Sequence, residues 1–416
     1  MRTVHLLRKL NPAEWGGTET AIQRLFDGLR EHGVKSVVYC PRLDCESLDD
    51  PLVASGYEVQ RFRAFVPVLG MSRERKQQLV SVGGNLMSFD LISSLRREED
   101  VSIIHSHTLG RIGGIALAAA RKRNVPFVVT IHGGVLDLPE KVKQTFNAPV
   151  VSGWEWGKLF GLLFRSHRLL ADADAIITCN PREAALWQEK FPEKRVLVQP
   201  HGVPMADYQK DYREQAQAAF PNICGREVLL SAGRVDPIKN QAWLLEQAPE
   251  IFRKRPDALL VFAGACTDAP YGEQIARQIR ELGLQNRVLL TGGLPQGDPR
   301  LIGLMQEARA LLLPSLSETF GLVILEAWAA GTMVLSSRTS GASALIEQGK
   351  NGWLFDLEKP ETFRAALDRT LSQPAASREM AARGATKVRE HYSINALAGR
   401  MKRLYEELME AKRCVT

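Results

Sequence analysis

Short apolar runs alternate with longer amphipathic stretches from one end of the chain to the other. A short apolar run between polar residues is typical of a strand buried on both faces, and an amphipathic stretch is typical of a helix that covers it. The predicted strands comprise residues 3–7, 36–40, 102–105, 127–131, 175–179, 195–199, 228–232, 258–263, 287–291, 310–314 and 332–336. The predicted helices include residues 20–32, 110–122, 275–282 and 322–330. This alternation predicts an α/β fold with parallel sheets that carry helices on both faces.

The strand–helix pattern starts again near Val228, after a polar, proline-containing stretch at residues 199–208. A length of 416 residues suits two domains of about 200 residues each. We therefore expect two Rossmann-like, doubly wound domains, residues 1–204 and 205–391, that face one another across a cleft. Such domains bind ligands at the carboxyl ends of their strands. Residues 392–416 are predicted to form a helix that packs back on the first domain.

Composition excludes several classes of protein. The chain is 45% hydrophobic and 24% charged, as in a soluble globular protein, and its six cysteines are scattered without a zinc or disulfide pattern. Charges interrupt the N-terminal apolar run, and no window reaches the ~20 apolar residues of a spanning helix, so we expect a cytoplasmic protein. A net charge of +7 is mild for this length, and basic residues are not interleaved with aromatic ones, so no nucleic-acid partner is expected.

A glycine loop with Gly16 and Gly17 follows the first predicted strand and precedes a predicted helix. Glycine lets backbone N–H groups approach a ligand, and a helix N-terminus favours an anion. The loop matches neither the dinucleotide fingerprint nor the phosphate loop of NTPases, so a tight turn without a ligand is an equal alternative.

Histidines lie near the ends of first-domain strands at His5, His105, His107 and His132. His105 and His107 are two residues apart and would share a face of a continued strand. A metal site would need a carboxylate or a third histidine nearby, and none is evident in the sequence. His132 follows a buried strand and precedes two glycines. Its position at a strand end favours a role near a reacting group over that of a core histidine.

The second domain opens with a strand that leads into Gly233 and Arg234, and Lys239 follows five residues later. Two cations at the carboxyl end of a strand suit a diphosphate, because arginine offers a fork of donors and lysine a compact charge. They would also stabilise a nucleoside diphosphate as a leaving group. An ordinary surface pair of cations is the alternative.

The segment 312–331 is predicted to form a strand, a loop and a helix, with Glu318 in the loop and Glu326 in an otherwise apolar helix. A buried carboxylate requires partners, and ribose hydroxyls would serve. The turn at Phe320, Gly321 and Leu322 would direct backbone N–H groups at an anion. Paired carboxylates also occur in glycoside hydrolases, but they do not usually share one strand–loop–helix beside a phosphate-binding turn.

Together these segments resemble family 4 of the retaining glycosyltransferases, which have the two-Rossmann GT-B fold. The landmarks are Glu318 and Glu326, Gly233-Arg234 with Lys239, and Gly16-Gly17, in the usual order along nearly the whole chain. The chain departs from the common pattern at Ala344, where an acidic residue is frequent, and at Thr332, where the family often has a Pro-Val turn.

The resemblance implies a role for each landmark. Glu318 would bind hydroxyls of the donor sugar and Glu326 the ribose. Arg234 and Lys239, with the N–H groups of Phe320, Gly321 and Leu322, would hold the diphosphate, and Gly17 would approach it from the first domain. His132 would face the sugar near its reacting carbon. Gly293 and Leu294 would contribute to the part that cups the base.

The resemblance also implies that a nucleotide sugar is the co-substrate, that no metal or other cofactor is needed, and that transfer retains the anomeric configuration. A nucleotide-sugar epimerase, a phosphorylase of the same architecture and a silent partner subunit are alternatives, and none has its own signature here.

The acceptor is left open. Residues 61–97 combine apolar and basic side chains that would suit a lipid-linked acceptor at a membrane surface, as in bacterial surface-polysaccharide or glycolipid assembly. These are Phe62, Phe65, Val66, Val68 and Leu69 beside Arg61, Arg63, Arg73, Arg75 and Lys76. A soluble sugar phosphate, or an ordinary loop and helix with no ligand, would suit the same stretch.

Overall fold

The computed structural model describes residues 1–12, 15–42, 50–73, 76, 79–80, 86–132, 154–155, 157–295 and 297–414. The chain divides into two compact units, one of residues 1–200 with 394–416 and one of residues 201–393. The units meet along the chain at Pro200–His201 and at Ser393–Ile394, whereas the sequence placed these boundaries at 204–205 and 391–392. Each unit is an α/β domain built on its own parallel sheet, so the predicted fold class is confirmed.

The described strands of the first unit form a seven-stranded parallel sheet in the order β3-β2-β1-β5-β6-β8-β9. These strands are β1 (Arg2–Leu6), β2 (Lys35–Pro41), β3 (Glu58–Phe62), β5 (Val101–Ser106), β6 (Phe127–Ile131), β8 (Ala175–Thr178) and β9 (Val196–Val198). A separate antiparallel pair consists of β4 (Val68–Leu69) and β7 (Trp154–Glu155). The central strands are buried along their length, as two-sided coverage by helices requires.

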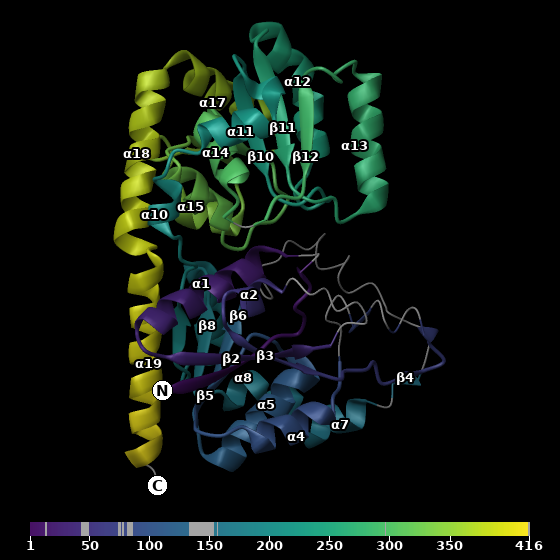
Figure 1. Cartoon of the computed structure of the whole chain (residues 1–416), viewed down its shortest axis with the longest axis vertical. Coiled ribbons are helices and arrows are strands. Elements are labelled where there is room, and N and C mark those ends of the chain that lie inside the picture. The colour runs from purple at the N-terminus through teal and green to yellow at the C-terminus, as the bar shows by residue number, and fades with distance from the viewer. Residues whose placement is uncertain are drawn as a thin grey trace. The chain divides into compact units, whose positions relative to one another are not determined.

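Helices cover both faces of this sheet (Figure 1). They are α1 (Gly17–Glu31), α2 (Pro51–Ala54), α4 (Asp90–Arg97), α5 (Gly110–Arg123), α7 (Lys158–Leu163), η2 (Ser166–Arg168), α8 (Leu169–Asp172), α9 (Pro181–Lys190) and α19 (Ile394–Cys414). The C-terminal helix α19 packs against α1. Its Ala398, Met401 and Tyr405 share a buried cluster with Ile103 of β5 and Val128 of β6. The last helix therefore completes the core of the first unit.

The described strands of the second unit form a six-stranded parallel sheet in the order β12-β11-β10-β13-β14-β15. They are β10 (Glu227–Ala232), β11 (Ala258–Ala263), β12 (Val288–Gly292), β13 (Ala310–Leu313), β14 (Val334–Ser337) and β15 (Trp353–Phe355). The helices are α10 (Met205–Tyr208), α11 (Arg213–Ala219), η3 (Pro221–Ile223), α12 (Gln241–Lys254), α13 (Ala269–Glu281), α14 (Pro299–Glu307), α15 (Leu322–Ala329), α16 (Ser340–Leu345), α17 (Pro360–Ser372) and α18 (Pro374–His391).

Each sheet has a point at which the chain reverses the direction in which it adds strands. In the first unit this switch point lies between β1 and β5, and in the second between β10 and β13. Loops that leave such neighbouring strands in opposite directions open a crevice at the carboxyl edge, where doubly wound sheets bind their ligands. The loops after these four strands are therefore the places to look for a site.

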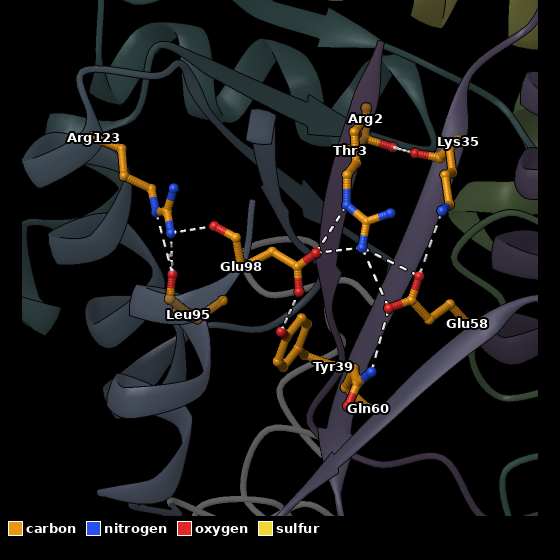
Figure 2. A network of polar contacts seen from close by, with 9 residues as sticks. All are labelled: Arg2, Thr3, Lys35, Tyr39, Glu58, Gln60, Leu95, Glu98 and Arg123. Carbon is orange, nitrogen blue, oxygen red and sulfur yellow. Dashed lines mark hydrogen bonds and ion pairs between the residues drawn. The ribbon is translucent and has the colours of Figure 1, made fainter. Parts of the chain in front are cut away.

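The polar network at the amino end of β1 is structural (Figure 2). The Arg2 guanidinium donates to Glu98 at 2.8 Å and to Glu58 at 3.1 Å. The Tyr39 hydroxyl donates to the second oxygen of Glu98 at 2.5 Å, and Arg123 donates to the carbonyl of Leu95 at 2.7 Å. The network ties β1, β2 and β3 to the segment between α4 and β5.

Candidate functional site

Two loops flank the switch point of the second unit, one after β10 (residues 233–240) and one after β13 (residues 314–321). They are tied together by backbone contacts. The N–H of Leu316 donates to the carbonyl of Ile238 at 2.8 Å, and the Asn240 side chain donates to the carbonyl of Pro314 at 3.1 Å. The loops therefore form one rigid platform at the carboxyl edge of the sheet.

Lys239 and Glu318, one from each loop, form an ion pair on this platform. Their Nζ and Oε2 atoms are 2.5 Å apart, and the two side chains are only 19% and 17% exposed. Water screens a pair at this depth less than a pair on the open surface. The structure thus brings together the residue predicted to bind diphosphate and the residue predicted to bind the sugar.

Asp236 organises the first loop. Its side chain is buried, and one of its oxygens accepts the N–H of Lys239 at 3.0 Å while the other pairs with Arg234 at 3.1 Å. The Arg234 side chain remains 46% exposed. Asp236 was not among the predicted site residues, although a carboxylate between a predicted arginine and lysine was a visible signal.

The first residues of α16 donate hydrogen bonds to the backbone of the Glu318 loop. The N–H of Gly341 donates to the carbonyl of Glu318 at 2.7 Å, and the Ser340 hydroxyl donates to the same oxygen at 3.3 Å. A Cβ at position 341 would lie 2.6 Å from the nitrogen of Phe320 and 2.7 Å from the oxygen of Glu318. Only glycine therefore allows α16 to approach this closely.

Gly321 and Leu322 form the junction between the loop and α15. Gly321 has φ of +87°, a left-handed conformation that glycine adopts without strain, and it caps a helix that begins at Leu322. The first N–H groups of a helix have no partners within the helix and carry the positive end of its dipole. Phe320 is buried, and its ring contacts His201 with centroids 4.8 Å apart.

Glu326 lies in the second turn of α15 and is only 7% exposed. The other residues from Ile324 to Ala329 are buried and apolar. A carboxylate in such a setting is costly unless it accepts hydrogen bonds, which fits the predicted contact with hydroxyl groups.

Gly293 and Leu294 follow β12, which lies at the edge of the sheet and is separated from β10 by β11. The N–H of Gly264 donates to the carbonyl of Gly292 at 3.1 Å, and that of Val235 donates to the carbonyl of Ala265 at 2.9 Å. The loop after β11 thus connects the loops after β10 and β12, so Gly293 and Leu294 lie on the same carboxyl edge of the sheet as Arg234.

In the first unit, Gly16 and Gly17 lie where they were expected, at the start of α1. The N–H of Gly16 donates to the carboxylate of Glu19 at 3.1 Å, and the N–H of Thr20 donates to the carbonyl of Gly16 at 3.1 Å. Among the described residues, a Cβ at Gly17 would have no neighbour within 4 Å. This capping box uses the Gly16 amide within the protein and leaves the Gly17 backbone open to approach.

The histidines of the first unit form a cluster at its switch point. The Nδ1 atom of His5 is 3.0 Å from Nε2 of His107, and Nδ1 of His107 is 2.7 Å from Nε2 of His132. His105 stacks on His107 with ring centroids 4.2 Å apart. The inference that no third histidine lies near His105 and His107 was wrong, because β1 pairs with β5 and places His5 opposite His105. Gly133 and Gly134 lie outside the described residues.

The stretch that would suit a lipid-linked acceptor is partly buried and partly exposed. Phe62 and Val66 are buried in the main cluster of the first unit, and Arg61 pairs with Asp50 at 2.5 Å. Leu69 is exposed, and Arg75 lies outside the described residues. Phe89 of the same stretch is 50% exposed and contacts the rings of Phe65 and Phe160, and Leu162 and Leu163 of α7 are 65% and 70% exposed. Within the described ranges, no helix is both long and apolar enough to cross a membrane.

Comparisons with known proteins identify the family. The family model described as Glycosyltransferase Family 4 matches residues 15–207, and the model described as Glycosyl transferases group 1 matches residues 213–388. The fold and the two matches define a glycosyltransferase with the GT-B fold. The chain belongs to glycosyltransferase family 4.

Curated relatives with the name D-inositol 3-phosphate glycosyltransferase are similar to this chain. The protein from Thermobispora bispora is 28% identical, over 79% of this chain and 76% of its own length. That from Frankia alni is 30% identical, over 65% of this chain and 66% of its own length, so the alignments span about two thirds to three quarters of these relatives.

Solved structures share the fold at low identity. Anabaena HepE in complex with UDP-glucose is 17% identical, with a TM-score of 0.74 over 98% of this chain and 100% of that one. Sucrose-phosphate synthase from Thermosynechococcus elongatus is 20% identical, with a TM-score of 0.73 over 99% of both chains.

Proposed function

We propose that this glycosyltransferase takes its sugar from a nucleotide diphosphate sugar and transfers it to a hydroxyl group with retention of the anomeric configuration. The observation that carries the proposal is the Lys239–Glu318 pair at the switch point of the second unit. It holds a cation suited to a diphosphate against a carboxylate suited to sugar hydroxyls.

The proposed donor site divides into parts. Lys239 and Arg234 hold the diphosphate, together with the N–H groups of Phe320, Gly321 and Leu322. Glu326 accepts hydrogen bonds from the ribose, and Glu318 accepts them from the sugar. Gly293 and Leu294 cup the base. In the first unit, Gly17 contributes its backbone N–H group, Gly16 shapes the turn before it, and His132 contacts the sugar.

The two cations and the start of α15 would stabilise charge as the diphosphate leaves, so we propose that transfer needs no metal ion. Retention would follow if the acceptor attacks from the face that the diphosphate leaves, with the departing phosphate accepting the proton of the acceptor hydroxyl. The solved structures of Anabaena HepE with UDP and UDP-glucose support a uridine nucleotide as the first donor to test.

Two acceptors deserve a direct comparison. The exposed Phe89, Leu162 and Leu163 favour a lipid-linked acceptor of surface-polysaccharide or glycolipid assembly, reached by a peripheral protein on the inner face of the membrane. The name of the curated relatives favours a soluble polyol or sugar phosphate instead.

The test is a screen of UDP-, GDP- and ADP-sugars against lipid-linked and phosphorylated acceptors, with and without EDTA. Release of the nucleoside diphosphate and the anomeric coupling of the product by ¹H NMR are measured. We expect release that depends on both donor and acceptor, persists in EDTA and gives the donor's anomeric configuration. No release with any pair would contradict the proposal. An isomerised nucleotide sugar without acceptor would indicate an epimerase.

A further inference from the structure

Four side chains in the first unit form one continuous chain of hydrogen bonds. Thr3 Oγ1 is 3.0 Å from Nε2 of His5, Nδ1 of His5 is 3.0 Å from Nε2 of His107, and Nδ1 of His107 is 2.7 Å from Nε2 of His132. The chain starts inside β1, crosses to the residue after β5 and ends at the residue after β6. It therefore links the buried interior of the sheet to the proposed catalytic histidine.

Burial keeps the inner members of the cluster neutral. His5 is completely buried, and desolvation together with the neighbouring His107 lowers its pKa well below the ordinary value. Desolvation and the adjacent histidines likewise lower the pKa of His105. A neutral imidazole has one N–H donor and one acceptor nitrogen, so the proton on each ring decides which way the next one must point.

The contacts of Thr3 at the buried end determine the direction of the chain. Thr3 Oγ1 lies 3.4 Å from the carbonyl of Lys35, which can only accept a hydrogen bond, and 3.3 Å from Oγ of Ser36, which can donate or accept. If the Thr3 hydroxyl donates to that carbonyl, its oxygen accepts from Nε2–H of His5. His5 then accepts at Nδ1 from Nε2–H of His107, and His107 accepts at Nδ1 from Nε2–H of His132. This direction satisfies the ring contacts with each ring in the same tautomer and also uses the contact with the Lys35 carbonyl, which the reverse direction leaves unused.

We propose that His107 is a positioning residue that holds His132 with its ring proton on Nε2, so that Nδ1 accepts a hydrogen bond from a hydroxyl of the donor sugar. Because Nε2 of His132 is engaged by His107, a ring contact with a ligand must use Nδ1. The sugar as ligand rests on the proposed function, whereas the tautomer does not.

A metal site is the rival interpretation of the same cluster, because the ligand atoms of His5, His105 and His107 lie within 4.8 Å of one another. Both nitrogens of each ring already have a protein partner. Those of His105 contact the Tyr405 hydroxyl and the Thr130 hydroxyl, each at 2.6 Å. A metal would displace these contacts in a fully buried place, so the hydrogen-bond chain accounts for the cluster better.

The tautomer of His132 can be measured without a substrate. Ring-¹⁵N-labelled histidine and two-bond ¹H–¹⁵N correlation spectra distinguish Nε2–H from Nδ1–H, and His132→Gln identifies its signal. We expect Nε2–H in the wild type and in His107→Asn, whose side-chain oxygen can still accept from His132. His107→Leu removes the acceptor and should give a mixture of tautomers.

Transfer activity tests the consequence. His107→Leu should lower kcat/KM about tenfold or more, as is typical when the partner that orients a functional histidine is removed. His107→Asn should restore most of the loss. Tyr405→Phe is the matched control, because it removes a buried hydrogen bond from His105 of the same cluster but leaves the chain to His132 intact.

Several outcomes would overturn the proposal. These are Nδ1–H in the wild type, an unchanged tautomer in His107→Leu, or equal losses in His107→Leu, His107→Asn and Tyr405→Phe. Stoichiometric zinc in the purified protein that disappears in His5→Leu would overturn it in favour of the metal. Failure of every donor would refute the proposed function alone, since the spectra would still decide the tautomer.

Discussion

Nζ of Lys239 and Oε2 of Glu318 are 2.5 Å apart, although the two residues come from different loops of the second unit. The two opposite charges attract one another. A diphosphate bound at Lys239 would therefore compete with Glu318, and a sugar hydroxyl that donated to Glu318 would weaken its attraction to the lysine. The pair couples the two halves of the proposed donor.

Glu318→Gln should separate nucleotide binding from transfer. Loss of the competing carboxylate frees Lys239, so UDP should bind about three- to tenfold more tightly, within the range expected for a partly buried ion pair. Transfer should fall about ten- to a hundredfold, because a charged hydrogen bond to the sugar is lost. Isothermal titration and steady-state rates provide the two measurements.

Glu347→Gln is the control for that experiment, since Glu347 pairs with Lys387 at 3.2 Å on the same unit but outside the proposed site. Weaker UDP binding in Glu318→Gln than in this control would refute the competition.

Glu326→Gln should weaken UDP binding about ten- to a hundredfold, because a buried carboxylate that accepts from hydroxyls is replaced by a neutral amide. The loss of affinity should be smaller for 2′-deoxy-UDP, which lacks one of the two ribose hydroxyl groups that Glu326 could bind. The same loss with both nucleotides would place Glu326 away from the ribose. Thermal unfolding of the variant shows whether the fold is intact.

Gly341→Ala should impair transfer by displacing the Glu318 loop. The new Cβ would lie 2.6 Å from the nitrogen of Phe320 and 2.7 Å from the oxygen of Glu318, both backbone atoms that must shift. We expect a loss of about 1–3 kcal/mol in stability from overpacking and at least a tenfold fall in kcat/KM. Gly161→Ala in α7 is the matched control, because within the described part of the chain its Cβ would have only Arg111 Cγ as a neighbour, at 4.0 Å.

Arg2→Met should reduce the acid sensitivity of the first unit. Burial alone would raise the pKa of Glu58, but hydrogen bonds from Gln60 and Arg2 and the positive charges of Arg2 and Lys35 outweigh it, and the pKa is lowered (Figure 2). A lowered folded-state pKa gives stability that is present above the unfolded pKa and is lost as the pH falls through the folded one.

Urea midpoints at neutral pH and near pH 4 test this dependence. The wild type should lose more stability than Arg2→Met between the two pH values. Lys35→Met should have a smaller effect, because Lys35 is 3.8 Å from Glu58 and 67% exposed. Equal losses of stability between the two pH values in the wild type and in Arg2→Met would contradict the role of Arg2 in lowering the pKa of Glu58.

Much of the fold was predictable because central parallel strands are continuous apolar runs. The strands β3 and β15 were missed, whereas the other two edge strands of the main sheets, β9 and β12, were predicted. Glu58–Phe62 carries polar residues and lacks the continuous apolar run of a buried strand, and Trp353–Phe355 has only three residues.

The candidate site was predictable in its residue types but not in its pairings. Lys239 and Glu318 were chosen for separate contacts, and only the adjacency of β10 and β13 makes them partners. The same holds for His5, whose link to His107 depends on the pairing of β1 with β5. A sequence gives the order of strands along the chain, whereas these contacts depend on their order across the sheet.

The position of helix α19 at the end of the chain determines when the first unit can complete its core during synthesis. Residues 394–414 supply part of the core of the first unit, but the ribosome produces them only after residues 201–393. At a synthesis rate of ~5–20 residues per second, the faces of β5, β6 and β8 that α19 covers are uncovered for roughly ten to forty seconds before the helix is made. The unit that is synthesised first is thus the one that is completed last.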